Sequence, residues 1–304
     1  MKINLGINTG FAVNRYPEPE VWTQIVGEEL GLRNVQFTAD MLNVSLPDHI
    51  LKDQADRISS ASAQYGISIT STFTGAFTRV NHLAHPDREV RSYWVSWFKR
   101  FVDLTVELGA RSMGSHFGIF SQRDDSDPKC RAERLRQNIE GWHEVGRYAK
   151  ERGLDFISWE PMSITREQGE TIENALRLQE EVNKNAPIDF KICLDLDHGD
   201  VSSPNPDDTD PYAWIRSVAT KAPIIHLKQS SSDKSGHWPF TAKHNINGRI
   251  VPGEVLKVLK ESGAKEVELL FELSFRERQP ADSTVVEVLK ESVAYWREDI
   301  LPTI

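Results

Sequence analysis

Eight short apolar runs alternate with eight amphipathic segments along this chain, and that alternation limits the folds open to it. The amphipathic segments repeat apolar residues every three or four positions, which predicts helices, most clearly at residues 90–108. Alternating strands and helices are typical of parallel α/β sheets. We expect strands at residues 3–8, 34–38, 67–72, 112–116, 155–160, 190–195, 224–228 and 267–272. We expect helices at residues 19–30, 51–65, 90–108, 131–152, 166–182, 211–219, 253–261 and 284–298.

Glycine follows five of these predicted helices and precedes the next strand, at Gly31, Gly66, Gly109, Gly153 and Gly263. A glycine at that position accepts the left-handed backbone conformation that ends a helix. Eight strand–helix units in 304 residues predict an α/β protein with the (β/α)8 TIM-barrel fold. A doubly wound sheet is the alternative, but residues 8–11 lack the glycine-rich turn of such folds. No low-complexity linker divides the chain, so we expect a single domain over residues 1–304.

The composition excludes several classes of partner. The formal net charge is −9, which disfavours nucleic acid and anionic membranes as partners. No apolar run approaches the roughly 18–20 residues of a membrane span. The chain begins with a strand-like pattern instead of a signal peptide, and Cys130 and Cys193 lack a metal-binding or redox spacing. We therefore expect a cytoplasmic protein.

Four of the predicted strands end in a carboxylate or an imidazole. These residues are Glu160, Asp195, His226 and Glu272, and each lies about one strand-plus-helix unit after the previous one. Neighbouring parallel strands bring such residues to one edge of the barrel, where three buried carboxylates repel one another unless a cation joins them. Oxygen ligands with one imidazole favour Mn²⁺ or Mg²⁺, with Co²⁺ or Zn²⁺ also possible. The sequence therefore predicts a divalent-metal site.

Substrate contacts are expected from residues near the ends of other strands. Lys228 and Ser230 follow the seventh strand and Arg278 follows the eighth, at the two loops that often bind phosphate in barrels. A solvated loop with scattered charge is the alternative for these residues. His116 ends the fourth strand, where it is either a substrate contact or a structural imidazole bonded to the backbone.

The motifs around these residues carry a family resemblance. The runs at residues 159–161, 194–198, 226–228 and 271–272 resemble those of the xylose isomerase-like sugar phosphate isomerases and epimerases, in particular the ketose 3-epimerases. The resemblance implies that Glu160, Asp195, His226 and Glu272 bind the metal in that order. It also implies that Glu160 and Glu272 are the catalytic acid/base pair and that His198 contacts the substrate. Residues 6–11 and 159–163 look most like the tetrulose-phosphate epimerases of erythritol catabolism.

We therefore expect an isomerase that moves a proton at the carbon next to the carbonyl of a small ketose phosphate, with erythrulose phosphate favoured. Such epimerisation needs a proton-transfer group on each face of the ketose, and two glutamates beside a shared metal supply them. The alternatives are an aldose–ketose 1,2-isomerase, an endonuclease IV-like phosphodiesterase and a non-catalytic sugar-binding barrel. The expected partner is a small ketose or ketose phosphate, not nucleic acid or a membrane, and a homo-oligomer is possible.

Overall fold

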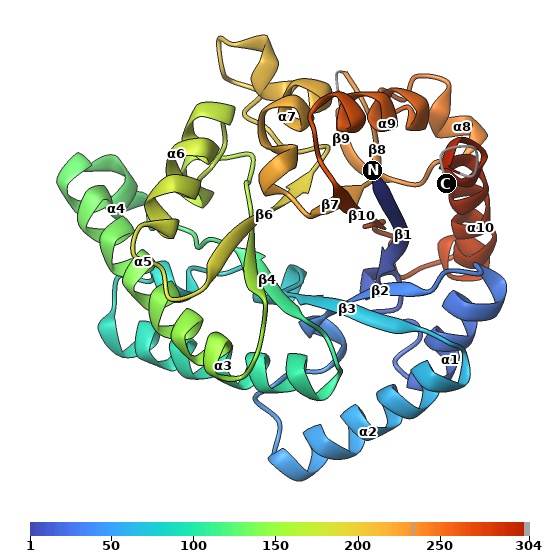
Figure 1. The fold of residues 1–304 in the computed structure, drawn as a ribbon, viewed down its shortest axis with the longest axis horizontal. Coiled ribbons are helices and arrows are strands. Elements are labelled where there is room, and N and C mark those ends of the chain that lie inside the picture. Colours follow the sequence, from blue (N-terminus) through green and yellow to red (C-terminus); the bar gives the residue numbers. More distant parts are fainter. Residues whose placement is uncertain (233, 301–304) are drawn as a thin grey trace.

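The computed structural model describes residues 1–232 and 234–300, and its eight main strands close into a parallel barrel (Figure 1). Around the barrel the strands follow the order β1-β10-β7-β6-β5-β4-β3-β2. They are β1 (Lys2–Asn8), β2 (Asn34–Thr38), β3 (Ser68–Phe73), β4 (Ser112–His116), β5 (Phe156–Glu160), β6 (Asp189–Asp195), β7 (Ile224–Leu227) and β10 (Glu266–Phe271). Every predicted strand is present with ends within one residue of those expected, so the TIM-barrel prediction is confirmed. The single-domain assignment stays a prediction.

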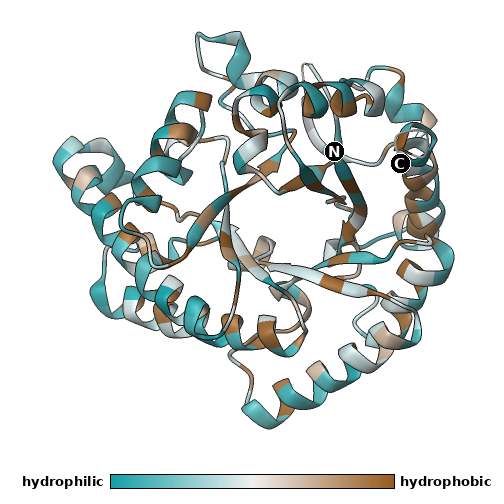
Figure 2. Ribbon diagram, viewed as in Figure 1, coloured by the Kyte–Doolittle hydropathy of each residue, from teal (hydrophilic) through white to brown (hydrophobic). Residues whose placement is uncertain are grey.

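Helices surround the barrel, with apolar and polar residues interspersed along them (Figure 2), and the residues that they bury are mostly apolar. The longer ones are α2 (Asp48–Gln64), α3 (Arg88–Glu107), α5 (Pro128–Glu151), α6 (Ile172–Asn183), α9 (Pro252–Glu261) and α10 (Ala281–Ile300). The five glycines expected to end helices all have positive φ, between 61° and 89°. Their backbone therefore takes the left-handed conformation predicted from the sequence. Within the described residues, no helix combines the length and apolar content that crossing a membrane requires.

Local backbone chemistry explains where predicted helices and loops differ from the structure. The helix expected from residue 166 begins at Ile172, because Gln168 and Gly169 both have positive φ and interrupt the helical path. The helix expected from residue 131 begins at Pro128, because the side chain of Asp127 caps its first N–H groups. The helix expected at residues 19–30 is α1 (Pro19–Gln24) followed by a π-helical turn.

Two of the segments between a strand and the next helix contain regular structure. The loop after β4 holds α4 (Gln122–Ser126). The loop after β7 forms an antiparallel hairpin of β8 (Gln229–Ser231) and β9 (Lys234–Trp238), followed by α8 (Ala242–Asn245). The remaining helix, α7 (Pro211–Val218), lies where it was expected. The loop hairpin brings β9 back across the carboxyl end of the barrel, since the backbone N–H of Gly236 donates to Asp197 beyond β6 at 3.0 Å.

The interior of the barrel depends on one close approach. A Cβ atom at Gly114 in β4 would lie 2.4 Å from the ring of Phe73 and 2.3 Å from Ser158 Oγ. The ring of Phe73 in turn packs edge-on against His226, with centroids 5.3 Å apart. Glycine at position 114 thus leaves room for the aromatic ring that supports the imidazole at the barrel edge.

We expect Gly114→Ala to lower the free energy of unfolding by about 1–3 kcal/mol, because the added methyl group overpacks the interior. Gly141→Ala in α5 is the matched control, since the added Cβ would lie 3.4 Å from the side chain of Leu83, an ordinary van der Waals distance. In that helix alanine should stabilise by about 0.5–1 kcal/mol. Urea unfolding of both variants measures the difference, and equal stability would contradict the packing argument.

Candidate metal centre and active-site cavity

The barrel brings the four predicted metal ligands together at its carboxyl end. Glu160 and Asp195 are the last residues of β5 and β6, His226 lies near the end of β7, and Glu272 directly follows β10. The sheet register sets His226 opposite Asp195 on the neighbouring strand. One potential ligand atom from each residue lies within 4.8 Å of the others. The spacing of four strand ends in the sequence therefore becomes one compact cluster in space.

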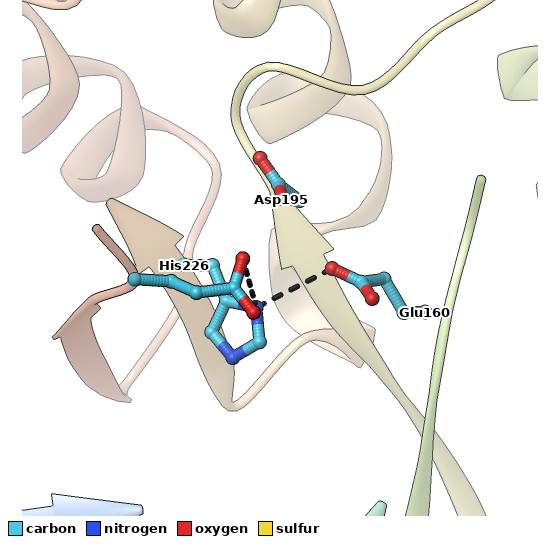
Figure 3. A group of neighbouring side chains, drawn as sticks. Glu160, Asp195 and His226 are labelled. Atoms are coloured by element: carbon cyan, nitrogen blue, oxygen red, sulfur yellow. Dashed lines mark hydrogen bonds and ion pairs between the residues drawn. The ribbon is translucent and has the colours of Figure 1, made fainter. Parts of the chain in front are cut away.

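His226 occupies the middle of this cluster. Its Nδ1 lies 3.3 Å from Glu160 Oε1 (Figure 3) and 3.5 Å from Glu272 Oε2. Its Nε2 lies 2.7 Å from Gln36 Oε1, which also accepts a hydrogen bond from Asn8. Because an amide oxygen only accepts hydrogen bonds, Nε2 must carry the proton. Nδ1 is then the ring atom that faces the carboxylates, and on loss of its proton it is the atom that would bind a metal ion.

A lysine balances part of the negative charge. Lys228 is fully buried, and its ammonium group pairs with Asp195 Oδ2 and, at 3.3 Å, with Glu272 Oε2. Burial alone would lower the pKa of Lys228, but Asp195, Glu272 and Glu160 raise it above its ordinary value. Three carboxylates and one ammonium leave two negative charges, which one divalent ion would neutralise.

Two carboxylates of this cluster, Asp195 and Glu272, stay ionised in spite of their burial. Burial acts to raise the pKa of Asp195, but His198, Lys228 and other neighbouring basic groups hold it below its usual range. For Glu272, burial is likewise outweighed by His226 and Lys228, so its pKa is also lowered. Ionised carboxylates and one imidazole are hard and borderline ligands of the kind that divalent cations bind. The buried cluster is therefore chemically able to hold a metal ion.

A cavity of about 340 Å³ opens directly above the cluster. Glu160, Glu272, His116 and His198 all line it, together with His237 from the β8–β9 hairpin. A second cavity of about 270 Å³ adjoins the first and shares Glu272 and His237 with it. Both glutamates of the expected acid/base pair thus face the space in which a small substrate fits.

The two predicted substrate-contact histidines both lie at this cavity. His198 Nδ1 donates to the carbonyl of Pro161 at 3.0 Å, and its Nε2 lies 3.3 Å from Asp195 Oδ2. His116 Nε2 donates to the carbonyl of Val80 at 3.0 Å. Burial lowers the pKa of His116, which keeps its ring neutral near pH 7. His116 therefore lines the cavity and bonds to the backbone, and its contact with the substrate stays a prediction.

The residues expected at the phosphate-binding loops do not gather around the cavities. Ser230 is buried in β8, where its hydroxyl accepts a hydrogen bond from Arg249 at 2.9 Å. Arg278 is exposed and belongs to neither cavity lining. The ammonium of Lys228 is engaged by the carboxylates of the cluster. The position of Ser230 follows from the hairpin after β7, which the sequence pattern did not predict.

Sequence reasoning also missed several residues of the site. Arg79 and Glu167 line the main cavity and form a two-point ion pair across the loops after β3 and β5. Gln36 orients His226 from β2. Neither feature has a local motif, because each depends on how separate loops or strands meet. The one available signal was Gln36 itself, a polar residue in the middle of a predicted strand.

Comparisons of the sequence with known proteins identify a family and a relative of this chain. Residues 26–298 match the family described as xylose isomerase-like TIM barrels. Over 301 residues the chain is 44% identical to D-erythrulose 1-phosphate 3-epimerase from Brucella abortus (strain 2308), covering 99% of this chain and 97% of the relative.

Solved structures share the fold. A xylose isomerase candidate from Rhodospirillum rubrum ATCC 11170 superposes with a TM-score of 0.87 and 24% identity, covering 97% of this chain and 99% of the other. A D-psicose 3-epimerase from Clostridium cellulolyticum H10 superposes with a TM-score of 0.70 and 15% identity, covering 98% of each chain. The family expected from the sequence motifs is confirmed: the chain belongs to the xylose isomerase-like TIM-barrel family.

Proposed function

We propose that this protein is a divalent-metal-dependent epimerase that inverts C3 of D-erythrulose 1-phosphate. The observation that carries the proposal is the placement of two glutamates, Glu160 and Glu272, within 3.5 Å of His226 Nδ1 and at the same cavity. The 44% identity to an epimerase of this substrate, over nearly the whole of both chains, supports the choice of ketose.

Glu160, Asp195, His226 and Glu272 would hold the cation, and Lys228 would stay paired with Asp195. A divalent cation bound there would polarise the ketose carbonyl at C2 and stabilise the negative charge that develops on its oxygen. One glutamate removes the C3 proton, and the electron pair of the broken C–H bond moves toward the carbonyl oxygen. The other glutamate returns a proton to the opposite face of C3, which inverts that carbon.

The remaining properties are proposed from the same chemistry. Three carboxylates and one imidazole favour Mn²⁺ or Mg²⁺ as the native ion, with Co²⁺ and Zn²⁺ as alternatives that the ligands also accept. A cytoplasmic enzyme that acts on a small phosphorylated ketose, with no nucleic-acid partner, fits the net charge of −9. A homo-oligomer is compatible with this activity.

The activity is tested with D-erythrulose 1-phosphate and Mn²⁺ in D₂O. Because C3 is the single stereocentre of this ketose, its epimer is its mirror image, so optical rotation should decay to zero while one deuterium enters C3. D-Erythrulose 4-phosphate provides the comparison, since its free C1 hydroxyl also permits aldose formation. Absence of C3 exchange on both tetrulose phosphates would contradict the proposal, and aldose formation would favour the 1,2-isomerase.

The two-glutamate mechanism predicts that Glu160→Gln and Glu272→Gln each remove proton transfer at one face of C3. Each variant should lose inversion by about 10²–10⁴-fold, because one of the two proton-transfer groups is gone. Each should still exchange the C3 proton of one enantiomer, and the two variants should differ in which enantiomer that is. Glu133→Gln on the outer face of α5 is the control and should behave as wild type. Loss of exchange on the same enantiomer in both variants would indicate a single base.

The metal centre is tested by titrating chelator-treated protein with Mn²⁺ during thermal unfolding. Binding to the folded state alone should stabilise wild type by about 2.7 kcal/mol at a hundred times Kd. His226→Gln removes the imidazole ligand and should greatly reduce this Mn²⁺-dependent gain. Asp53→Asn on the exposed face of α2 is the control and should keep it. An unchanged gain in His226→Gln would contradict the assigned metal site.

A further inference from the structure

A phosphorylated substrate needs a cationic partner, and the two cavities at the barrel mouth offer few. Of the described side chains that line either cavity, Arg79 alone belongs to an arginine or lysine. It lies in the loop between β3 and α3, on the lining of the same cavity as Glu160 and Glu272. Lys228 is already paired with two carboxylates of the metal cluster, Asp195 and Glu272. Arg79 is therefore the basic group available to a substrate anion.

The guanidinium of Arg79 is held along one edge. Its Nε donates to Glu167 Oε1 at 2.7 Å and its Nη2 donates to Glu167 Oε2 at 2.6 Å. The side chain of Glu167 is only 2% exposed, whereas that of Arg79 is 51% exposed. A guanidinium has five N–H donors, so this two-point pair leaves three, and Nη1 meets no acceptor in the described part of the chain. Glu167 therefore orients Arg79 without using up its hydrogen-bonding capacity.

The loop that carries Arg79 is fixed on both sides of it. The backbone N–H of Phe77 donates to Asp40 Oδ2 at 3.1 Å, and the carbonyl of Val80 accepts from His116 at 3.0 Å. The side chain of Asn81 donates to the carbonyl of Ile119. A donor that is already positioned loses little conformational freedom when it binds a ligand, which favours affinity.

We infer that Arg79 binds the phosphate group of the substrate and so selects phosphorylated over free ketoses. This inference rests on the proposed function, whose substrate carries the phosphate. Arginine is suited to the role because its planar fork matches the oxygens of a phosphate in two-point hydrogen bonds. Phosphate recognition then lies after the third strand of the barrel and not at the loops after the seventh and eighth, where the sequence pattern placed it.

The test compares D-erythrulose 1-phosphate with unphosphorylated D-erythrulose, using C3 deuterium exchange with Mn²⁺ bound. For Arg79→Gln, kcat/KM on the phosphate ester should fall about 10- to 100-fold, mainly through KM, because a charge-assisted hydrogen bond is lost. Exchange on free D-erythrulose should stay at the wild-type rate. Arg57→Gln is the matched control, since Arg57 forms a similar two-point pair with Glu20 and is 43% exposed on α2. It should change neither rate.

Several outcomes would overturn the assignment. An equal loss on both ketoses in Arg79→Gln would mean that the Arg79–Glu167 pair only shapes the cavity. Selective loss on the phosphate ester in Arg278→Gln, with Arg79→Gln unchanged, would return phosphate binding to the loop after β10. Should Arg79→Gln fail to fold, Arg79→Lys keeps the charge and should show a smaller loss confined to the phosphate ester.

A binding measurement separates failure of this inference from failure of the proposed function. Calorimetric titration of the Mn²⁺-loaded protein with inorganic phosphate requires no turnover. Wild type and Arg57→Gln should bind phosphate more tightly than Arg79→Gln by a similar factor of about 10 to 100. Equal affinity in all three proteins would mean that phosphate binds elsewhere, including at the metal, and would overturn the role of Arg79 whatever the reaction catalysed.

Discussion

The repulsion among three carboxylates at one edge of the barrel is the constraint on which the site depends. Glu160, Asp195 and Glu272 lie within a few ångströms of one another, and all three are largely removed from solvent. Such a cluster is strongly unfavourable unless positive charge is present, because desolvation and mutual repulsion both disfavour the ionised form. Lys228 supplies one positive charge from within the barrel, and a divalent ion would supply the rest. The same excess of negative charge that destabilises the cluster would attract a divalent cation.

The barrel holds this arrangement by rigid elements. Three of the four predicted ligands lie within strands whose register is fixed by main-chain pairing, so their side chains cannot move apart without breaking the sheet. The imidazole of His226 is further fixed by Gln36 from the opposite side of the barrel and by the ring of Phe73. Other cavity-lining groups lie outside the barrel strands, where Arg79 and His237 are placed by contacts between separate segments. In the proposed mechanism the barrel strands therefore hold the metal-binding groups, and the segments between them hold the group that selects the substrate.

This division explains what could be predicted from the sequence. The strands and the ligands at their ends were predictable, because an apolar run and the glycine after each helix are local signals. The roles of Lys228 and Ser230 were less accessible, because they depend on the hairpin of β8 and β9, whose polar sequence resembles an ordinary loop. Arg79 could not be recognised at all, since its position relative to the cavity follows from its pairing with Glu167, which is distant in the chain.

The two glutamates of the proposed mechanism have unequal surroundings. Glu160 has a side chain only 8% exposed, whereas that of Glu272 is 26% exposed and contacts Lys228 at 3.3 Å. For a tetrulose 1-phosphate the two epimers are mirror images, so their free energies are identical and the equilibrium constant is one. The ratio of kcat to KM must then be the same in both directions, however different the two glutamates are. Any difference between the two glutamates can therefore make kcat and KM unequal for the two enantiomers, but not the ratio of kcat to KM. A glutamate that is the weaker base in one direction must accordingly be the better acid in the other.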